Sequence, residues 1–472
     1  MRISVLVRVL LATAILALSS AGSRMDIAPR LLLLQGDHHR AQKEYSLAIE
    51  QYAELAALRP RFSVPHVRMG EIYIAQGRWD EAEQQFTQAR ELDERDAPAL
   101  AGLAQVAHHH GDKWRAVELW RAALAVSPRD VEIRYGAAQT YLGSSEFAAA
   151  EEELQRIIIQ EGDHQGARYL LGLVSAAEER ALAVEHLSIA ASGGDTVLAA
   201  SAREMLEVLA DIGSGQQDVG HEAALLAHAY LRLEEPTLAL RQLKRVISLQ
   251  PENYNARAYA GYTLFSLSDH DSARRTLREV TREDPKNPLG YYFLGLLHRS
   301  EGYLPTALWE FQRALHLDAS NAAVYAEIAN TYQRTGRVAE AGEWYRAAIS
   351  VAPDEPGFRL LLAQFYADVV LKPERALAAA REAVALAPGD PVARELLGWA
   401  HYLVGNLPEA RISLEHALDL DPTFARAYYH LGIVYEDVGD REMARWAFQR
   451  AVDLDEDGTY RAKAAQQTQT SS

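Results

Sequence analysis

Residues 336–353 read GRVAEAGEWYRAAISVAP, and residues 77–94, far upstream, read GRWDEAEQQFTQARELDE. Both stretches begin with Gly-Arg and then place an alanine and, four residues later, an aromatic residue at the same positions (Ala341 and Tyr345, Ala82 and Phe86). Residues four apart lie on one face of an α-helix, so the pattern predicts a helix that packs against a neighbour. Its recurrence indicates an internal repeat.

A step of 34 residues carries the pattern along the chain. A small residue precedes each turn by seven positions: Gly36, Gly70, Ala104, Ala138, Gly172, Ala227, Gly261, Gly295, Ala329, Ala363, Gly398 and Gly432. A second small residue follows each turn by five positions: Ala48, Ala82, Ala116, Ala150, Ala239, Ala273, Ala307, Ala341, Ala376, Ala410 and Ala444. A large apolar residue comes four positions after most of these: Tyr52, Phe86, Trp120, Leu154, Leu243, Leu277, Phe311, Tyr345, Leu414 and Phe448.

Each period is expected to form a helical hairpin, because apolar residues recur at spacings of three and four on both sides of the turn. Glycine at the turn supplies the left-handed conformation that ends a helix, and proline stops the second helix of several periods. The small residues let the paired helices approach closely, and the large residue fills the space beside that contact. A single hairpin cannot bury its apolar face alone, so neighbouring hairpins must stack.

Twelve such periods in phase, over residues 29–458, resemble the tetratricopeptide repeat family. The resemblance implies an all-α fold, a right-handed superhelical solenoid of antiparallel helix pairs. It also implies that the first helix of each pair lines the concave face of the solenoid.

The frame is interrupted once, after a repeat with a shortened turn that begins near Gln165. A predicted helix from Thr196 to Ile212 and the sequence GSGQQDVG follow it. We therefore expect five parts: a signal peptide (1–21), an N-terminal block of five repeats (29–195), a connecting helix with a Gly-rich joint (196–219), a C-terminal block of seven repeats (220–458) and a polar tail (459–472). One extra residue in YADVVLKPERA is expected to lengthen an inter-helix turn.

The N-terminus has the parts of a bacterial secretory signal peptide. Arg2 and Arg8 give a basic start, Val9 to Leu18 is an apolar run too short to span a bilayer, and Ser19 and Ala21 are small residues at cleavage-site spacing. This favours export to the periplasm or beyond. Two alternatives stay open: an uncleaved anchor, which would be the chain's only expected contact with a membrane, and a true start at Met25, which would make the protein cytoplasmic.

Composition limits the classes of partner. The formal net charge is -17, and an acidic surface repels phosphate backbones, so nucleic acid is not an expected partner. The chain has no cysteine, which excludes disulfides, thiolate metal sites and a cysteine nucleophile.

No catalytic signature is found in the sequence. Gly213-Ser-Gly215 lacks the third glycine of a dinucleotide loop, and His221-Glu222 lacks the second histidine of a zinc-protease helix. The run His108–His110 invites a metal site, but adjacent helical residues point about 100° apart and cannot converge on one ion by themselves. We expect no enzymatic activity, no cofactor and no metal.

The informative surface is the predicted groove. On each first helix one stripe, at spacing four and then three, is expected to face it, as with Tyr292, Leu296 and Arg299. The candidate peptide-binding residues on this stripe are Tyr135, Gln139, Tyr169, Tyr262, Phe265, Tyr292, Asn330, Gln364, Trp399, Tyr402 and Tyr429. Aromatic side chains bury a large area at low entropic cost, and amides bond an extended backbone, so the mixture suits peptide recognition. The alternative is that some of these tyrosines pack against the next repeat.

Known ligand classes of the family do not carry over. Members that bind chaperones hold a C-terminal carboxylate with a Lys/Asn/Arg clamp; here Asn330 and Arg334 are present, but Ala326 stands where the clamp needs lysine. The resulting hypothesis is a non-enzymatic scaffold that binds a peptide or protein partner in its concave groove in the bacterial cell envelope. Its rivals are a cytoplasmic adaptor, an assembly component that self-associates through its convex face, and an arm that recruits a separate enzyme of polysaccharide or pilus assembly.

Overall fold

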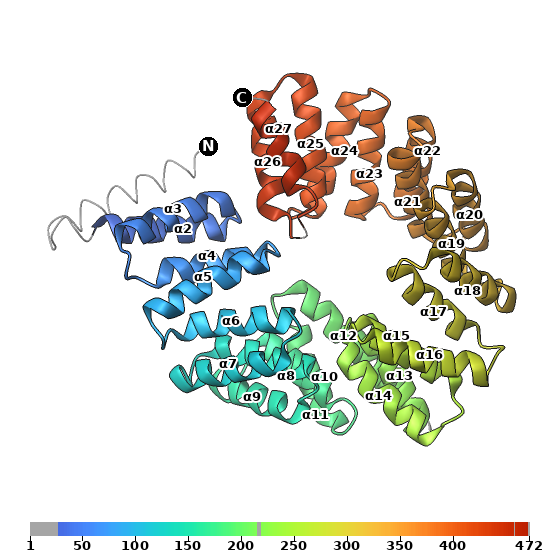
Figure 1. Cartoon of the computed structure of the whole chain (residues 1–472), viewed down its shortest axis with the longest axis horizontal. Coiled ribbons are helices and arrows are strands. Elements are labelled where there is room, and N and C mark those ends of the chain that lie inside the picture. The colour runs from blue at the N-terminus through green and yellow to red at the C-terminus, as the bar shows by residue number, and fades with distance from the viewer. Residues whose placement is uncertain (1–26, 215–218, 457, 471–472) are drawn as a thin grey trace. The chain divides into compact units, whose positions relative to one another are not determined.

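A computed structural model describes residues 27–214, 219–456 and 458–470 (Figure 1). Five helix pairs precede α12 (Thr196–Ser214): α2 (Ile27–Ala41) with α3 (Tyr45–Leu58), α4 (Val64–Ala75) with α5 (Trp79–Leu92), α6 (Ala97–His109) with α7 (Lys113–Val126), α8 (Val131–Gly143) with α9 (Phe147–Gln160), and α10 (Gln165–Ser175) with α11 (Arg180–Ala191).

Seven pairs follow α12: α13 (Val219–Arg232) with α14 (Pro236–Leu249), α15 (Tyr254–Ser266) with α16 (His270–Glu283), α17 (Pro288–Ser300) with α18 (Leu304–Leu317), α19 (Ala322–Arg334) with α20 (Val338–Val351), α21 (Pro356–Gln364) and its continuation η2 (Phe365–Val369) with α22 (Pro373–Leu386), α23 (Pro391–Leu403) with α24 (Leu407–Leu420), and α25 (Ala425–Val438) with α26 (Arg441–Leu454). A last helix, α27 (Arg461–Thr470), comes after them. The described residues form helices and connections without strands, so the predicted all-α solenoid of helix pairs is confirmed.

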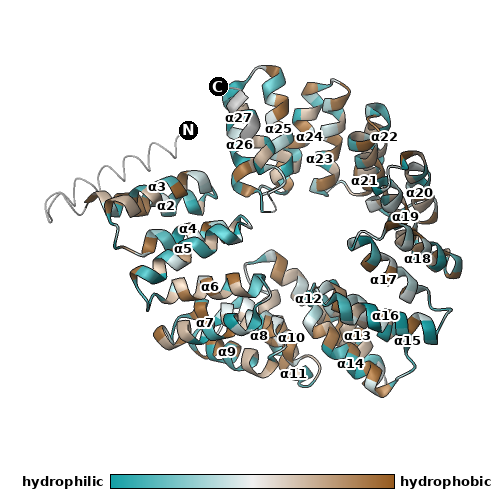
Figure 2. Ribbon diagram, in the orientation of Figure 1, coloured by the Kyte–Doolittle hydropathy of each residue, from teal (hydrophilic) through white to brown (hydrophobic). Residues whose placement is uncertain are grey.

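Small and large residues pack against each other inside each pair as the spacing predicts. The large residues Tyr52, Phe86 and Phe311 are at most 1% exposed, and the second small residues, such as Ala341, are fully buried. A Cβ atom built on Gly295 would lie 2.5 Å from the ring of Phe311, closer than any real contact allows. Hydrophobic and hydrophilic residues alternate along the helices, as amphipathic packing requires (Figure 2).

The turn inside most pairs uses a residue with positive φ. Glycine occupies this position in six pairs: Gly77, Gly111, Gly302, Gly336, Gly405 and Gly439. Other residues adopt the same left-handed conformation in five pairs: Lys43, Ser145, Glu234, Ser268 and Leu371. The repeat frame therefore fixes the turn even where the local residue does not favour it, because packing of the two helices outweighs a local conformational cost.

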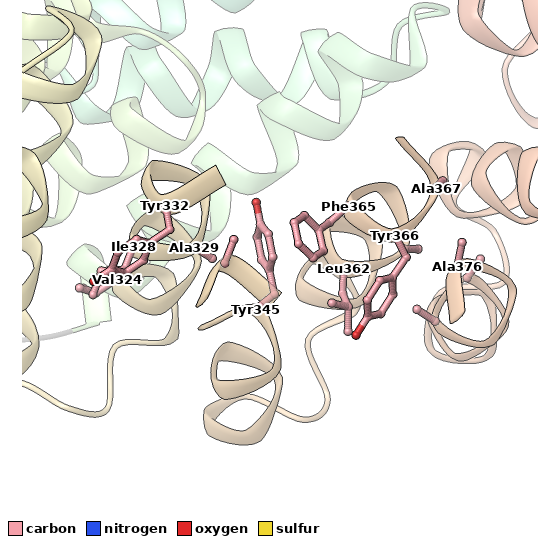
Figure 3. Packing of buried hydrophobic residues seen from close by; sticks show 14 of the residues in the cluster. Val324, Ile328, Ala329, Tyr332, Tyr345, Leu362, Phe365, Tyr366, Ala367 and Ala376 are labelled. Carbon is pink, nitrogen blue, oxygen red and sulfur yellow. The ribbon is translucent and has the colours of Figure 1, made fainter. Parts of the chain in front are cut away.

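The extra residue in YADVVLKPERA does not simply lengthen a turn, as expected, but is taken up in the helix itself. The segment η2 is a single π-helical turn, in which the Val370 amide donates to the Phe365 carbonyl at 3.1 Å. This wider turn keeps Phe365 and Tyr366 buried, with the ring of Phe365 beside that of Tyr345 at a centroid distance of 5.2 Å (Figure 3). The wider turn therefore takes up the extra residue while both aromatics stay in the core.

The connection between the fifth and sixth pairs contains the predicted helix, α12, which extends to Ser214. The predicted Gly-rich joint lies partly outside the described residues, since 215–218 are among those not described. The predicted polar tail is helical from Arg461 to Thr470, and Ala464 on this helix, α27, is buried.

The described contacts group the chain into two compact units. The first unit takes in the described residues up to Gly136 together with those from Thr423 onward, and the second takes in the described residues between Ala137 and Pro422. This grouping differs from the predicted division into blocks 29–195 and 220–458, which stays a prediction. Unit 1 thus combines the first repeats and the last repeat of the chain.

Among the described helices, none combines the length and the apolar character needed to cross a bilayer. The predicted signal peptide, residues 1–21, lies outside the described residues.

Candidate peptide-binding surface

The largest group of predicted binding residues lies on α15, α17 and α19, the first helices of three successive pairs in unit 2. Helix α17 contacts both α15 and α19. We call Tyr262, Tyr292, Arg299, Glu327 and Asn330 the aromatic–ion cluster. The ring of Tyr262 stacks on Phe293 of the next repeat at 4.7 Å and 22°.

The cluster is half-buried. Burial raises the pKa of Tyr292, and the nearby Glu327 carboxylate raises it further, so the phenol stays protonated and able to donate a hydrogen bond. The Arg299 guanidinium forms an ion pair with Glu327 across the two helices, with exposed side-chain fractions of 17% and 24%. Burial nevertheless raises the pKa of the Glu327 carboxyl, a rise that Arg299 only partly offsets.

The amide of Asn330 lies three residues after Glu327, on the same face of α19. It is half-buried on α19, and within the described part of the chain its side chain has no hydrogen-bond partner. Arg334, one turn further on, donates to the Arg299 carbonyl at 3.2 Å. An amide with its donor and acceptor both unused can bond an extended peptide backbone.

The other predicted residues are spread more widely. Trp399 and Tyr402 stack on each other on α23 at 4.9 Å and 13°, and both are half-buried. Tyr429 belongs to unit 1, where its ring lies 5.4 Å from that of Tyr460 and 5.9 Å from that of Phe448. These three aromatic residues are therefore described in two separate units.

Four predicted residues differ in the solvent exposure of their side chains. Tyr169 is only 5% exposed, so it is a core residue in this structure. Phe265 is half-buried and its ring lies 5.3 Å from His270, across the turn of its own repeat. Gln139 and Gln364 are exposed.

Tyr135 is half-buried on the first half of α8, in unit 1, while Gln139 on the same helix belongs to unit 2.

Sequence reasoning did not single out Glu327 as part of the surface, nor Tyr259, whose ring lies 5.4 Å from Phe293. A signal was available for both. Tyr259 precedes Tyr262 by three residues and Glu327 precedes Asn330 by three, which places each pair on one helical face.

The histidine run does not gather into a ligand set. His109 stacks on Trp79 at 3.9 Å and 10°, and His110 lies 4.0 Å from Asp80. Within the residues that the structure describes, no group of three or more metal-ligating side chains is found.

Models of the tetratricopeptide repeat match the chain at residues 39–106, 107–174, 225–288, 260–323, 322–355, 398–439 and 425–457. Together these matches cover most of the helix pairs on both sides of α12.

Three proteins illustrate what the chain is similar to. A probable UDP-N-acetylglucosamine–peptide N-acetylglucosaminyltransferase, SPINDLY, from Hordeum vulgare is 25% identical over 201 residues, which are 43% of this chain and 18% of that protein. Anaphase-promoting complex subunit 3 from Schizosaccharomyces pombe is 25% identical over 178 residues, 37% of this chain and 26% of that protein. The chain thus spans only a minor part of either relative.

The crystal structure of the APC/C hetero-tetramer Cut9–Hcn1 is similar at 14% identity, over 96% of this chain and 91% of that chain, with a TM-score of 0.44.

Proposed function

Because the chain belongs to the tetratricopeptide repeat family, whose members are scaffolds for protein–protein interaction, we propose that it binds a peptide segment of a partner protein on the aromatic–ion cluster of α15, α17 and α19. The observation that carries the proposal is the half-buried, unpartnered amide of Asn330 on α19, a first helix that contacts α17, the helix of Tyr292.

The chemistry of the cluster defines the ligand. Arg299 and Glu327 neutralise each other, so this surface offers no net charge to select a strongly acidic or basic segment. The tyrosine rings supply apolar area and a phenolic hydroxyl, and the Asn330 amide supplies one donor and one acceptor. This combination fits an uncharged, extended segment with apolar side chains.

The test uses peptides selected from a phage-displayed random library against the full chain. Their binding is then measured by fluorescence polarisation on Tyr262→Leu and Asn330→Ala variants, with Gln312→Ala on the exposed side of α18 as the matched control. We expect each cluster variant to weaken binding by about 1–3 kcal/mol and the control to leave it unchanged. Selected peptides that bind all three variants equally would place the binding surface elsewhere.

We further propose that the protein works outside the cytoplasm, in the bacterial cell envelope. The support is the N-terminal sequence, with Arg2 and Arg8 before an apolar run and Ala21 at cleavage-site spacing. Fractionation with N-terminal sequencing of the purified protein tests this. A mature chain that begins near Gly22 is expected, whereas a cytoplasmic chain that begins at Met25 would show that the protein is a cytoplasmic adaptor.

A further inference from the structure

Unit 1 joins residues from opposite ends of the chain through hydrogen bonds. Asp453, in the last turn of α26, accepts from the Ser46 amide at 3.0 Å and from the Ser46 hydroxyl at 2.7 Å. Gln449, one turn earlier, donates to the same hydroxyl at 2.8 Å and to Asp453 at 3.2 Å. Ser46 belongs to the first helix pair and Asp453 to the twelfth.

Asp453 is a buried carboxyl in the last turn of its own helix. It is 2% exposed, and burial raises the pKa of its carboxyl against the bonds from Ser46 and Gln449, which lower it. A carboxylate in the last turn of a helix also faces the negative end of that helix dipole. The matching residue one repeat earlier, Asp419, is exposed.

The role that fits Asp453 is a cap for another helix. Helix α3 begins at Tyr45 and its N-cap residue, Glu44, makes no capping bond with its side chain. The Ser46 amide is one of the first four amides of α3, which have no partner inside the helix. The carboxylate of Asp453 meets this amide at the positive end of the α3 dipole, where a negative charge is favourable.

Two arginines, by contrast, cap C-terminal helix ends, where carbonyl groups need donors. Arg450 donates to the carbonyls of Gln42 and Lys43, at 3.1 and 2.9 Å, in the turn that follows α2. Arg461 donates to the carbonyl of Gln76, the residue that ends α4, at 2.8 Å. Carbonyls at helix ends lack partners inside their helices, and a positive charge is favourable there.

The segment that follows α26 lies close to the turn of the second repeat. A Cβ atom built on Gly77 would lie 2.0 Å from the Glu456 carbonyl oxygen, whereas the turn glycines Gly111 and Gly336 have open space at that position. At Gly77, glycine is therefore needed for this close contact as well as for the turn, which is not so at Gly111 or Gly336.

We propose that the last repeat binds back onto the first two repeats of the same chain as a releasable clasp, in which Asp453, Arg450 and Arg461 cap helix ends of those repeats. The contacts exchange bonds with water for bonds with protein, so their net strength is modest and the clasp can open without unfolding either side. Opening it would expose the helix ends of α2, α3 and α4.

Hydrogen exchange at the Ser46 amide reports on the clasp, because no bond inside α3 protects that amide. In the full-length protein, Asp453→Ala is expected to speed this exchange by about tenfold or more. The matched variant Asp419→Ala should leave it unchanged. The amides of α25 show in the same data set whether the last repeat is still folded. An unchanged Ser46 rate in a folded Asp453→Ala protein overturns the proposal.

A second variant changes the second repeat instead and leaves the sequence of the last repeat intact. Gly77→Ala adds a methyl group against the Glu456 carbonyl, while Gly111→Ala introduces the same backbone conformation without that contact. We expect faster exchange at Ser46 only in Gly77→Ala. Equal rates in the two variants overturn the proposal even if Asp453→Ala does not fold. Protection that rises with protein concentration would assign the contact to a second copy and overturn an intramolecular clasp.

Discussion

At the scale of single residues, the array depends on contacts inside each helix pair. A small residue on the first helix leaves space for a large side chain on the second. Gly295 faces Phe311, which is fully buried, whereas Ala227 occupies the same frame position opposite Leu243. At Gly295 a Cβ atom would lie 2.5 Å from the Phe311 ring, so this pair needs glycine, whereas Ala227 shows that an alanine can be accommodated beside a leucine.

This compensation predicts the outcome of a double-mutant cycle. Gly295→Ala should overpack the Phe311 ring at a cost of about 1–3 kcal/mol. In a Phe311→Leu background the same change should cost at least about 0.5–1 kcal/mol less, because the smaller side chain leaves room for the methyl group. Urea denaturation of the four proteins measures the coupling. A coupling of zero would mean that the helices move apart instead.

Glu310 on α18 is a second residue whose environment sets a testable property. It is 7% exposed, and burial raises the pKa of its carboxyl from 4.5 to about 7, although the charge of Arg278 acts in the opposite direction. The unfolded chain releases this proton near pH 4.5, and the folded chain holds it until about pH 7. The contribution of Glu310 to stability is therefore fully present below pH 4.5 and is lost as the pH rises through 7.

Glu310→Gln removes this titration. We expect the variant and the wild type to have similar stability at pH 4.5, and the variant to be more stable at pH 8 by about 1–2 kcal/mol after allowance for solvent screening. Thermal melts at both pH values measure the difference, with the exposed Glu343→Gln as control. A difference that does not change with pH would show that folding leaves the pKa of Glu310 unshifted.

At the scale of helices and turns, the sequence frame predicts most of what the structure shows. The period locates the helix pairs, the turn positions and the buried alanines, because these follow from spacings that every repeat shares. The π-helical turn is not predictable in this way, since an extra residue can enter a helix or a turn with equal effect on the spacing. The stripe pattern also does not predict whether a given tyrosine faces the solvent or the core, as the buried Tyr169 shows.

The π-helical turn predicts how a deletion is tolerated. Asp368 is exposed within η2, and its removal restores the regular 34-residue spacing. We expect this deletion to change the melting temperature by less than about 3 °C. Deletion of Arg334, the matching residue of the preceding repeat, breaks a regular spacing and should lower it by about 5 °C or more. Circular dichroism melts test both; a larger loss for the Asp368 deletion would make the wider turn essential.

At the scale of the whole molecule, contacts that link repeats distant in sequence were beyond prediction, because no local pattern marks a bond between Ser46 and Asp453. Contacts between the fifth and sixth helix pairs also have no local pattern in the sequence. Within unit 2, the Tyr230 hydroxyl on α13 donates to the Leu173 carbonyl on α10 at 2.7 Å. Arg180 on α11 also pairs with Glu222 on α13 at 2.9 Å, so these repeats contact each other directly.

These direct contacts predict that a cut in the connection does not separate the chain. The composition of residues 213–220, GSGQQDVG, predicts that limited proteolysis cuts there first. The two fragments should nevertheless elute together from a native sizing column while separating in denaturing gels. They should do so even with Asp453→Ala, which removes the proposed clasp, because the buried bond of Tyr230 and the pairing of Arg180 with Glu222 remain. Fragments that elute separately in that background would show that the covalent connection, and not packing, joins the fifth and sixth repeats.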